Sequence, residues 1–265
     1  MGKIISICNQ KGGTGKTTTT VNLSAALAEH QQKVLMVDLD PQGNATSGVG
    51  INKNELRVSV YDVLLNKLGV RDVLVKGVAP GLDVIPCNIS LTGAEIELVG
   101  ALSRETRLKK ALDPLRDQYD FIFIDSPPSL GLLTLNALVA CDGLIIPIQC
   151  EFYALEGVSQ LMNTIGLIKD GLNEHLRIEG VLLTMADFRT NLTNEVINEI
   201  KGYFRDKVYR TIIPRNVRLS EAPSHGKPIN FYDEGSIGAK RYKDLALEVL
   251  GVLPRQGEDG ALSEQ

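Results

Sequence analysis

The feature that most constrains the fold is a short apolar segment that runs directly into a glycine-rich loop. Residues 4–8 are apolar at nearly every position, and residues 10–18 read Gln-Lys-Gly-Gly-Thr-Gly-Lys-Thr-Thr. A strand, such a loop and then a helix form the arrangement in which main-chain N–H groups and a helix N-terminus bind phosphate groups. The sequence therefore predicts a phosphate-binding loop near the start of an α/β fold.

The loop departs from the usual phosphate-binding pattern in its lysines. That pattern places a glycine five residues before Gly15, where this chain has Gln10, and a second lysine, Lys11, precedes the glycine pair. We expect Lys16 to neutralise the terminal phosphates and Thr17 to ligate Mg²⁺. The residues predicted to contact the nucleotide in this loop are Lys11, Gly12, Gly13, Thr14, Gly15, Lys16, Thr17 and Thr18.

Two further apolar segments end in carboxylates. Residues 34–37 lead to Asp38 and Asp40, and residues two apart in a strand point the same way, here towards the phosphate site. We expect Asp40 to orient an attacking water, with Asp38 a further candidate that would hold a water on the metal. The alternative is that one of them only caps the Asp-Pro turn. Residues 121–124 close on Asp125, which we expect to bind the Mg²⁺ water shell.

Apolar strand-like runs alternate with helical patterns along most of the chain. Several runs are apolar at almost every position, as in parallel strands covered by helices on both faces. The pattern predicts an α/β fold with a doubly wound, mostly parallel sheet that binds ligands at the carboxyl ends of its strands. We expect one domain over residues 1–254 and a disordered tail at residues 255–265. The predicted strands are 4–8, 34–37, 82–85, 121–124, 144–148, 180–183 and 208–213. The predicted helices are 17–30, 104–112, 132–140, 155–169, 193–204 and 239–250, with Pro114 ending or kinking the second.

Composition narrows the class of protein. Charged residues make up 23% of the 265 residues and hydrophobic ones 43%, as in a globular protein, and no apolar run approaches the ~20 residues that span a bilayer. The four cysteines share no CxxC spacing, which favours buried reduced thiols over a zinc or iron–sulfur site. A net charge of −4 argues against nucleic-acid binding by bulk charge, but not against a local basic patch.

Taken in this order, the motifs resemble those of the ParA/Soj group. This group belongs to a superfamily of P-loop ATPases that also includes MinD and the nitrogenase iron protein. Besides the loop, the resemblance rests on residues 38–44, 125–130, 149–157, 213–218 and 221–228. It implies ATP and Mg²⁺ as ligands and a homodimer that sandwiches ATP, with Lys11 reaching the partner's phosphates. It also implies that Pro214 and Asn216 lie at the adenine, whereas the residues alone predict that Pro214 only ends a strand.

A basic segment stands out on this acidic chain. Residues 201–218 hold six lysines and arginines and one aspartate, a net charge of +5. Such a local excess suits sequence-independent phosphate binding, although a solvated basic helix face is the alternative. The resemblance implies nonspecific binding of double-stranded DNA, for which Arg189 and Arg218 are the best-placed candidates. The further candidates are Lys201, Arg205 and Lys207.

The resemblance implies a cytoplasmic, nucleoid-associated partitioning ATPase whose slow hydrolysis is stimulated by DNA and a ParB-type protein. A replication initiator is a further partner to consider, as is a link to sporulation. The main alternative, a MinD-like membrane-cycling ATPase, needs a basic amphipathic C-terminal helix, whereas residues 255–265 are acidic and have few apolar anchors. A nitrogenase-type reductase needs cysteines in residues 125–131, which have none. A small-molecule ligase or kinase needs an acceptor pocket, for which the sequence gives no signal.

Overall fold

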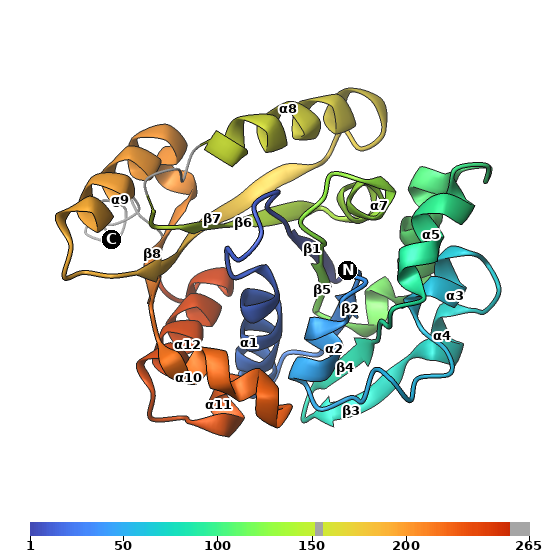
Figure 1. The fold of residues 1–265 in the computed structure, drawn as a ribbon, viewed down its shortest axis with the longest axis horizontal. Coiled ribbons are helices and arrows are strands. Elements are labelled where there is room, and N and C mark those ends of the chain that lie inside the picture. Colours follow the sequence, from blue (N-terminus) through green and yellow to red (C-terminus); the bar gives the residue numbers. More distant parts are fainter. Residues whose placement is uncertain (152–155, 255–265) are drawn as a thin grey trace, which may run out of the picture.

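An eight-stranded sheet in the order β3-β4-β2-β5-β1-β6-β7-β8 forms the centre of the computed structural model (Figure 1). The structure describes residues 1–151 and 156–254, with only the main chain at residues 156 and 157. Neighbouring strands run parallel, except that β3 pairs antiparallel with β4 at one edge. The strands are β1 (Lys3–Ile7), β2 (Val34–Asp38), β3 (Val75–Ala79), β4 (Leu82–Ile85), β5 (Phe121–Asp125), β6 (Gly143–Gln149), β7 (Arg177–Ala186) and β8 (Val208–Pro214).

Helices cover both faces of the sheet, so the molecule has two apolar cores. Alternation along β1 illustrates this: Ile4 packs in the core with α3–α9, and Ile5 and Ile7 pack in the core with α1, α2 and α10–α12. The α-helices are α1 (Lys16–Glu29), α2 (Asn44–Gly48), α3 (Val60–Leu64), α4 (Val70–Val73), α5 (Leu91–Leu98), α6 (Arg107–Leu112), α7 (Leu132–Ala140), α8 (Glu156–Gly171), α9 (Asn191–Phe204), α10 (Val217–Glu221), α11 (Ile229–Tyr232) and α12 (Ile237–Val249). The 3₁₀ helices are η1 (Arg104–Thr106), η2 (Asp113–Gln118), η3 (Arg205–Lys207) and η4 (Ala222–His225).

The predicted fold class is confirmed, and the seven predicted strands are present, residues 82–85 with the predicted ends and the other six with shifted ends. The helix predicted at residues 104–112 is divided into η1 and α6, and α6 ends two residues before Pro114, where η2 continues the chain. The edge strand β3 was not predicted, because its exposed sequence holds Gly77 at φ 67° and lacks an apolar run. The predicted tail, residues 255–265, and part of the 149–157 motif lie outside the described residues.

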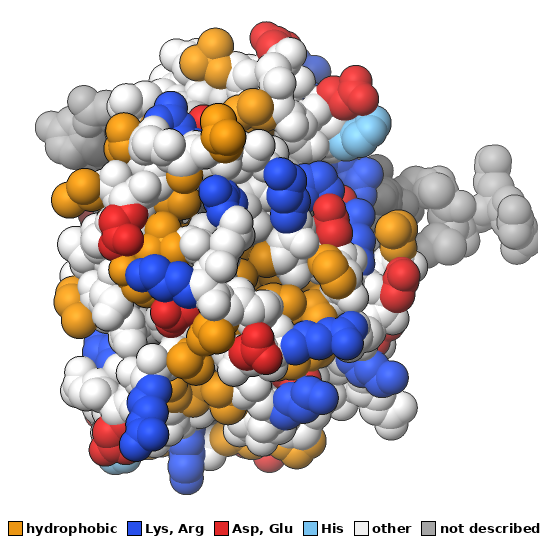
Figure 2. Space-filling model, turned by 90° about the vertical axis from the view of Figure 1, so that its right-hand side faces the viewer, with side chains coloured by type: hydrophobic (Ala, Val, Ile, Leu, Met, Phe, Trp, Pro, Cys, Tyr) orange, Lys and Arg blue, Asp and Glu red, His pale blue; other side chains and the backbone are white. Residues whose placement is uncertain are grey.

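One face of the molecule, formed by α3, α4 and α5, carries a band of apolar side chains among charges of both signs (Figure 2). Ile96 on α5 and the adjoining Val99 are 78% and 61% exposed. Lysines and arginines gather at the upper right of this view and are interspersed with acidic residues over the rest of the face.

Candidate nucleotide-binding site

The glycine-rich loop connects the carboxyl end of β1 to α1 and faces open space. Gly13 and Gly15 adopt φ values of 74° and 88°, in the left-handed region that favours glycine. A Cβ atom at Gly12 or Gly13 would meet no atom within 4 Å. The first turn of α1 has neither a side-chain cap nor an acidic residue. Its N–H groups are therefore directed at the loop, a geometry that fits an anionic phosphate chain.

Two hydrogen bonds to neighbouring strands and one within the loop segment hold this loop in place. Asn9 donates to the Pro147 carbonyl of β6 at 2.7 Å, and its amide oxygen accepts the Lys11 N–H at 3.0 Å. From β7, the Thr184 hydroxyl donates to the Thr14 carbonyl at 2.9 Å. The loop conformation is thus built into the sheet and does not depend on a ligand to form.

The two lysines of the loop face different ways. Lys16 is 7% exposed and its Nζ donates to the Lys11 carbonyl at 3.0 Å. Burial lowers the pKa of Lys16, and the nearby Asp125 charge opposes that effect. The Lys11 side chain, by contrast, is 40% exposed, and its Nζ lies 3.9 Å from Glu151 Oε2. The Lys16 ammonium therefore lies inside the loop, and the Lys11 side chain lies at the surface of the loop.

The two residues predicted to bind the metal lie in direct contact. Thr17 Oγ1 donates to Asp125 Oδ2 at 2.8 Å, and Thr20 Oγ1 donates to the other oxygen at 3.0 Å. Asp125 is fully buried, and its burial, together with the charge of Asp38, raises the pKa of its carboxyl group. Hydroxyl and carboxylate oxygens are the donors that Mg²⁺ prefers, so this pair fits the predicted ion.

Asp38 and Asp40 differ in what surrounds their carboxylates. Asp38 is fully buried and accepts the Thr46 N–H at 2.7 Å, the Thr46 hydroxyl at 2.6 Å and the Asp40 N–H at 3.2 Å. Asp40 is 9% exposed, and its Oδ1 accepts the Gln42 N–H at 2.9 Å. Its Oδ2 has no hydrogen bond to the described residues, which leaves it available to a water. The role of Asp38 in holding a metal-bound water stays a prediction.

Thr46 was not among the predicted site residues. It lies eight residues after Asp38, on the short helix α2. No periodicity relates the two positions, because the Asp40–Gly43 turn between them reverses the chain. The only available signal was the general preference of threonine for hydrogen bonds near turns.

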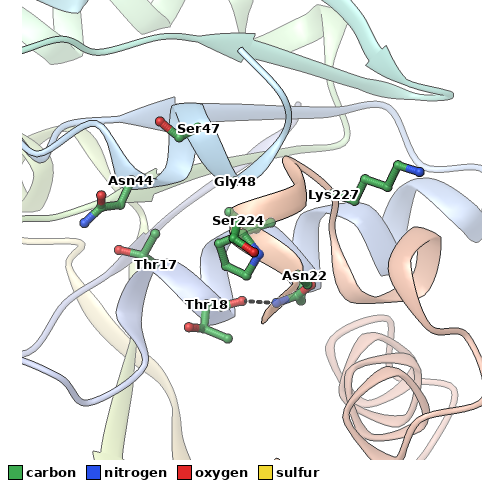
Figure 3. A pocket seen from close by; sticks show the side chains of 11 residues that line it. Thr17, Thr18, Asn22, Asn44, Ser47, Gly48, Ser224 and Lys227 are labelled. Atoms are coloured by element: carbon green, nitrogen blue, oxygen red, sulfur yellow. Dashed lines mark hydrogen bonds between the residues drawn. The ribbon is translucent and has the colours of Figure 1, made fainter. Parts of the chain in front are cut away.

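Two neighbouring cavities flank the start of α1. Pro214, at the end of β8, and Asn216, which caps α10 by accepting the Leu219 N–H at 3.3 Å, line a cavity of about 270 Å³ together with Thr18. A second cavity, of about 420 Å³, lies between α1, α2 and η4 (Figure 3). The first cavity adjoins the phosphate-binding loop and is the place where a base could lie, so the structure brings Pro214 and Asn216 to the predicted side of the loop.

The predicted DNA-binding residues fall at two ends of the sheet. Arg189 follows the carboxyl end of β7 and Arg218 follows that of β8, on the side of the phosphate-binding loop. Both are paired: Arg189 with Asp187 through two hydrogen bonds, and Arg218 with Glu221 at 2.8 Å. The further candidates Lys201, Arg205 and Lys207 lie at the amino end of β8. The +5 segment therefore does not form one patch on a single subunit.

All four cysteines, Cys8, Cys87, Cys141 and Cys150, are free and buried, as predicted. Burial raises the pKa of each thiol. They therefore contribute to the cores as small apolar residues.

The glycine-rich loop, the Thr17–Asp125 pair and the parallel sheet define a P-loop nucleotide-binding protein with an additional lysine in the loop. A family model described as an AAA domain matches residues 2–178. The chain is 63% identical to the sporulation initiation inhibitor protein Soj of Bacillus subtilis (strain 168), over 94% of this chain and 98% of Soj. It is 53% identical to the chromosome partitioning protein ParA of Myxococcus xanthus, over 94% of this chain and 88% of that protein. The chain belongs to the ParA/Soj family of chromosome-partitioning ATPases.

A solved structure from Mycobacterium smegmatis shares the fold and contains ligands. It is described as cobyrinic acid a,c-diamide synthase with bound ADP and magnesium, and it superposes with a TM-score of 0.83 at 38% identity, over 94% of each chain.

Proposed function

We propose that this chain is an ATP-dependent partitioning ATPase that dimerises around ATP, binds DNA without sequence preference and hydrolyses ATP when a ParB-type partner stimulates it. The observation that carries this proposal is the difference in burial between Lys16 and Lys11. Lys16 is buried and bonded within its own loop, whereas the Lys11 side chain is 40% exposed and lies near Glu151.

Binding of ATP in this proposal uses the loop amides, Lys16 and Thr17. The N–H groups of the α1 N-terminus and the Lys16 ammonium accommodate the phosphate oxygens. Thr17 and, through water, Asp125 hold Mg²⁺, which neutralises charge on the phosphate oxygens when it is bound. Pro214 and Asn216 contact the adenine. The ADP and magnesium named for the Mycobacterium smegmatis structure support this assignment.

Hydrolysis in this proposal needs a positioned water and additional positive charge. Asp40 orients the water, because its Oδ2 makes no hydrogen bond to the described residues and its main chain is held at the carboxyl end of β2. Lys11 of the partner subunit stabilises the charge of the transition state, as an arginine finger does. Hydrolysis is then slow in the monomer and depends on the dimer.

The dimer acts as the state that binds DNA. ATP shifts the equilibrium to the dimer only if it binds the dimer more tightly than the monomer, and a lysine that reaches across the interface provides that difference. Arg189 and Arg218 of both subunits then contribute to one DNA surface, which places the protein on the nucleoid. A ParB-type protein stimulates hydrolysis and release, and a replication initiator is a further candidate partner.

The test is the ATPase rate measured with and without duplex DNA and a peptide from a cognate ParB-type protein. We expect low basal turnover and a rise that requires both additions. Lys16→Ala serves as the control that removes nucleotide binding, and turnover that neither DNA nor the peptide changes would contradict the proposal.

A MinD-like membrane-cycling ATPase is distinguished by pelleting with anionic lipid vesicles in the presence of ATP. No helix among the described residues has the length and apolar character needed to cross a membrane. Residues 255–265, where an amphipathic anchor would lie, are outside the described part. The 53% identity to the chromosome partitioning protein ParA of Myxococcus xanthus favours the partitioning function. ATP-dependent pelleting with vesicles would favour the alternative.

A further inference from the structure

Thr46, a fully buried threonine on α2, hydrogen-bonds to the ends of two strands. Its hydroxyl lies 2.6 Å from Oδ2 of Asp38, the last residue of β2, and accepts the N–H of Cys87, just beyond β4, at 2.9 Å. A hydroxyl has one hydrogen and the Cys87 N–H can only donate, so the Thr46 hydrogen goes to Asp38. The order of donors is thereby fixed, from Cys87 to Thr46 to Asp38.

The same two partners also hold the main chain of Asp40. The Asp40 N–H donates to Asp38 Oδ1 at 3.2 Å, and the Asp40 carbonyl accepts the Cys87 thiol at 3.1 Å and the Gly43 N–H at 2.8 Å. The Asp40 N–H and the Asp40 carbonyl are therefore both hydrogen-bonded. Their partners are Asp38 and Cys87, which also bond to Thr46, and Gly43 of the turn that precedes α2. The position of the Asp40 carboxylate depends on this network.

The helix that carries Thr46 has five residues, too few for a helix that is stable by itself. Asn44, Ser47 and Gly48 of this helix line the cavity of about 420 Å³ that lies between α2, α1 and η4 (Figure 3). Thr46, on the buried side, is thus the polar attachment of α2 to the sheet.

We propose that Thr46 is a positioning residue for ATP hydrolysis, which holds the Asp40 turn in the geometry that orients the water. This inference rests on the function proposed above for Asp40. The Thr46 hydroxyl makes no hydrogen bond to Lys16, Thr17 or Asp125, so its loss affects the hydrolytic step and leaves binding of the phosphates in place.

The experiment compares Thr46→Val, which keeps the shape and removes the hydroxyl, with Thr46→Ser, which keeps the hydroxyl. Thr193→Val, at a buried threonine of α9 whose hydroxyl hydrogen-bonds with Thr190, is the matched control. Each variant is measured for the affinity of a fluorescent ATP analogue, for kcat and KM, and for hydrogen–deuterium exchange of the main chain.

We expect Thr46→Val to lower kcat by about 10-fold to 100-fold while analogue affinity changes less than about 3-fold. Main-chain exchange should accelerate in residues 38–48 and remain unchanged in α1. Thr46→Ser and the control should behave like the parent. Equal kcat in Thr46→Val and the parent, or equal losses of kcat and affinity, would overturn the inference.

Two further variants keep the result interpretable. Asp40→Ala tests the underlying function. If this variant hydrolyses ATP normally, the role proposed for Asp40 fails. An inactive Asp40→Ala beside a fully active Thr46→Val rejects only the role of Thr46.

If Thr46→Val does not fold, Cys87→Ala tests the same network, because it removes the thiol donor to the Asp40 carbonyl. A kcat reduced about 3-fold at unchanged KM then supports the inference, and an unchanged kcat rejects it.

Discussion

Asp38 and Asp125 lie directly opposite each other on the neighbouring parallel strands β2 and β5, and both are fully buried. Adjacent strands are about 4.8 Å apart, so two carboxylates share a small region without water. Each is surrounded by its own donors, Thr46 for Asp38 and Thr17 with Thr20 for Asp125. Two buried negative charges at this distance favour the arrival of a cation at the strand ends.

The first prediction concerns how far the repulsion between Asp38 and Asp125 lowers the free energy of unfolding. Asp125→Asn removes one of two repelling charges and keeps an oxygen acceptor for one of the two threonine hydroxyls, while its NH₂ group faces the other. The nucleotide-free protein should therefore gain about 1 kcal/mol, a rise of about 2–4 °C in Tm. Calorimetry measures it, with Asp117→Asn at an exposed position as the control. A fall in the Tm of Asp125→Asn would contradict repulsion between the two carboxylates. In the same variant, Mg²⁺ should no longer increase the affinity for nucleotide.

The second prediction separates the two lysines. Lys16→Ala should abolish nucleotide binding, because it removes the buried ammonium inside the loop. Lys11→Ala should leave binding to the monomer measurable and lose ATP-dependent dimerisation. Light scattering and phosphate release measure both, with Lys109→Ala, on the exposed side of α6, as the control. A Lys11→Ala protein that dimerises and hydrolyses like the parent would exclude the cross-subunit role.

The third prediction isolates hydrolysis from assembly. Asp40→Ala removes the carboxylate that we propose orients the water and leaves the Asp40 main-chain bonds intact, so turnover should fall by about 100-fold or more at nearly unchanged affinity. The variant should accumulate as a stable ATP-bound dimer in size-exclusion chromatography. Rapid turnover would move the water-orienting role to Asp38.

The sequence predicted the sheet and the loop because both depend on local patterns. Apolar runs specify buried parallel strands, and the glycines with Lys16 and Thr17 specify the loop between β1 and α1. The sequence did not reveal Thr46, whose role arises from hydrogen bonds that join β2, α2 and the end of β4. Contacts between segments far apart in the chain leave no periodic signal.

The basic segment shows the converse, because residues that are neighbours in the sequence do not form one site in the structure. Residues 201–218 are continuous in sequence and carry a net charge of +5, but the seven residues of β8 separate its two halves by about 20 Å. Charge counted along the chain is therefore not charge gathered at one place. The structure places Arg189 and Arg218 on the side of the phosphate-binding loop, and Arg205 at the opposite end of β8.

The fourth prediction uses this separation to locate the DNA surface. Arg189→Glu and Arg218→Glu should each weaken the binding of the ATP-bound dimer to all duplex sequences alike, while dimerisation persists. Arg205→Glu, at the far end of β8, should have a smaller effect. Each phosphate contact contributes about −0.9 to the slope of log K against log salt, so both loop-side variants should reduce that slope. A strong sequence preference in the parent would contradict phosphate contacts, which carry no base information directly.

The ion pairs of the two arginines make the last prediction specific. Arg189 donates two hydrogen bonds to Asp187, at 2.8 and 2.6 Å, and these bonds lower the pKa of the Asp187 carboxyl group to about 2. Asp187 therefore competes with DNA phosphates for the same guanidinium group. Asp187→Asn should release Arg189 and strengthen DNA binding by up to about 5-fold, the range expected for an exposed pair. Asp206→Asn, beside Lys207 at the far end of β8, is the matched control. Fluorescence anisotropy with labelled duplex DNA measures both variants, and equal gains in the two would attribute the effect to net charge rather than to Arg189.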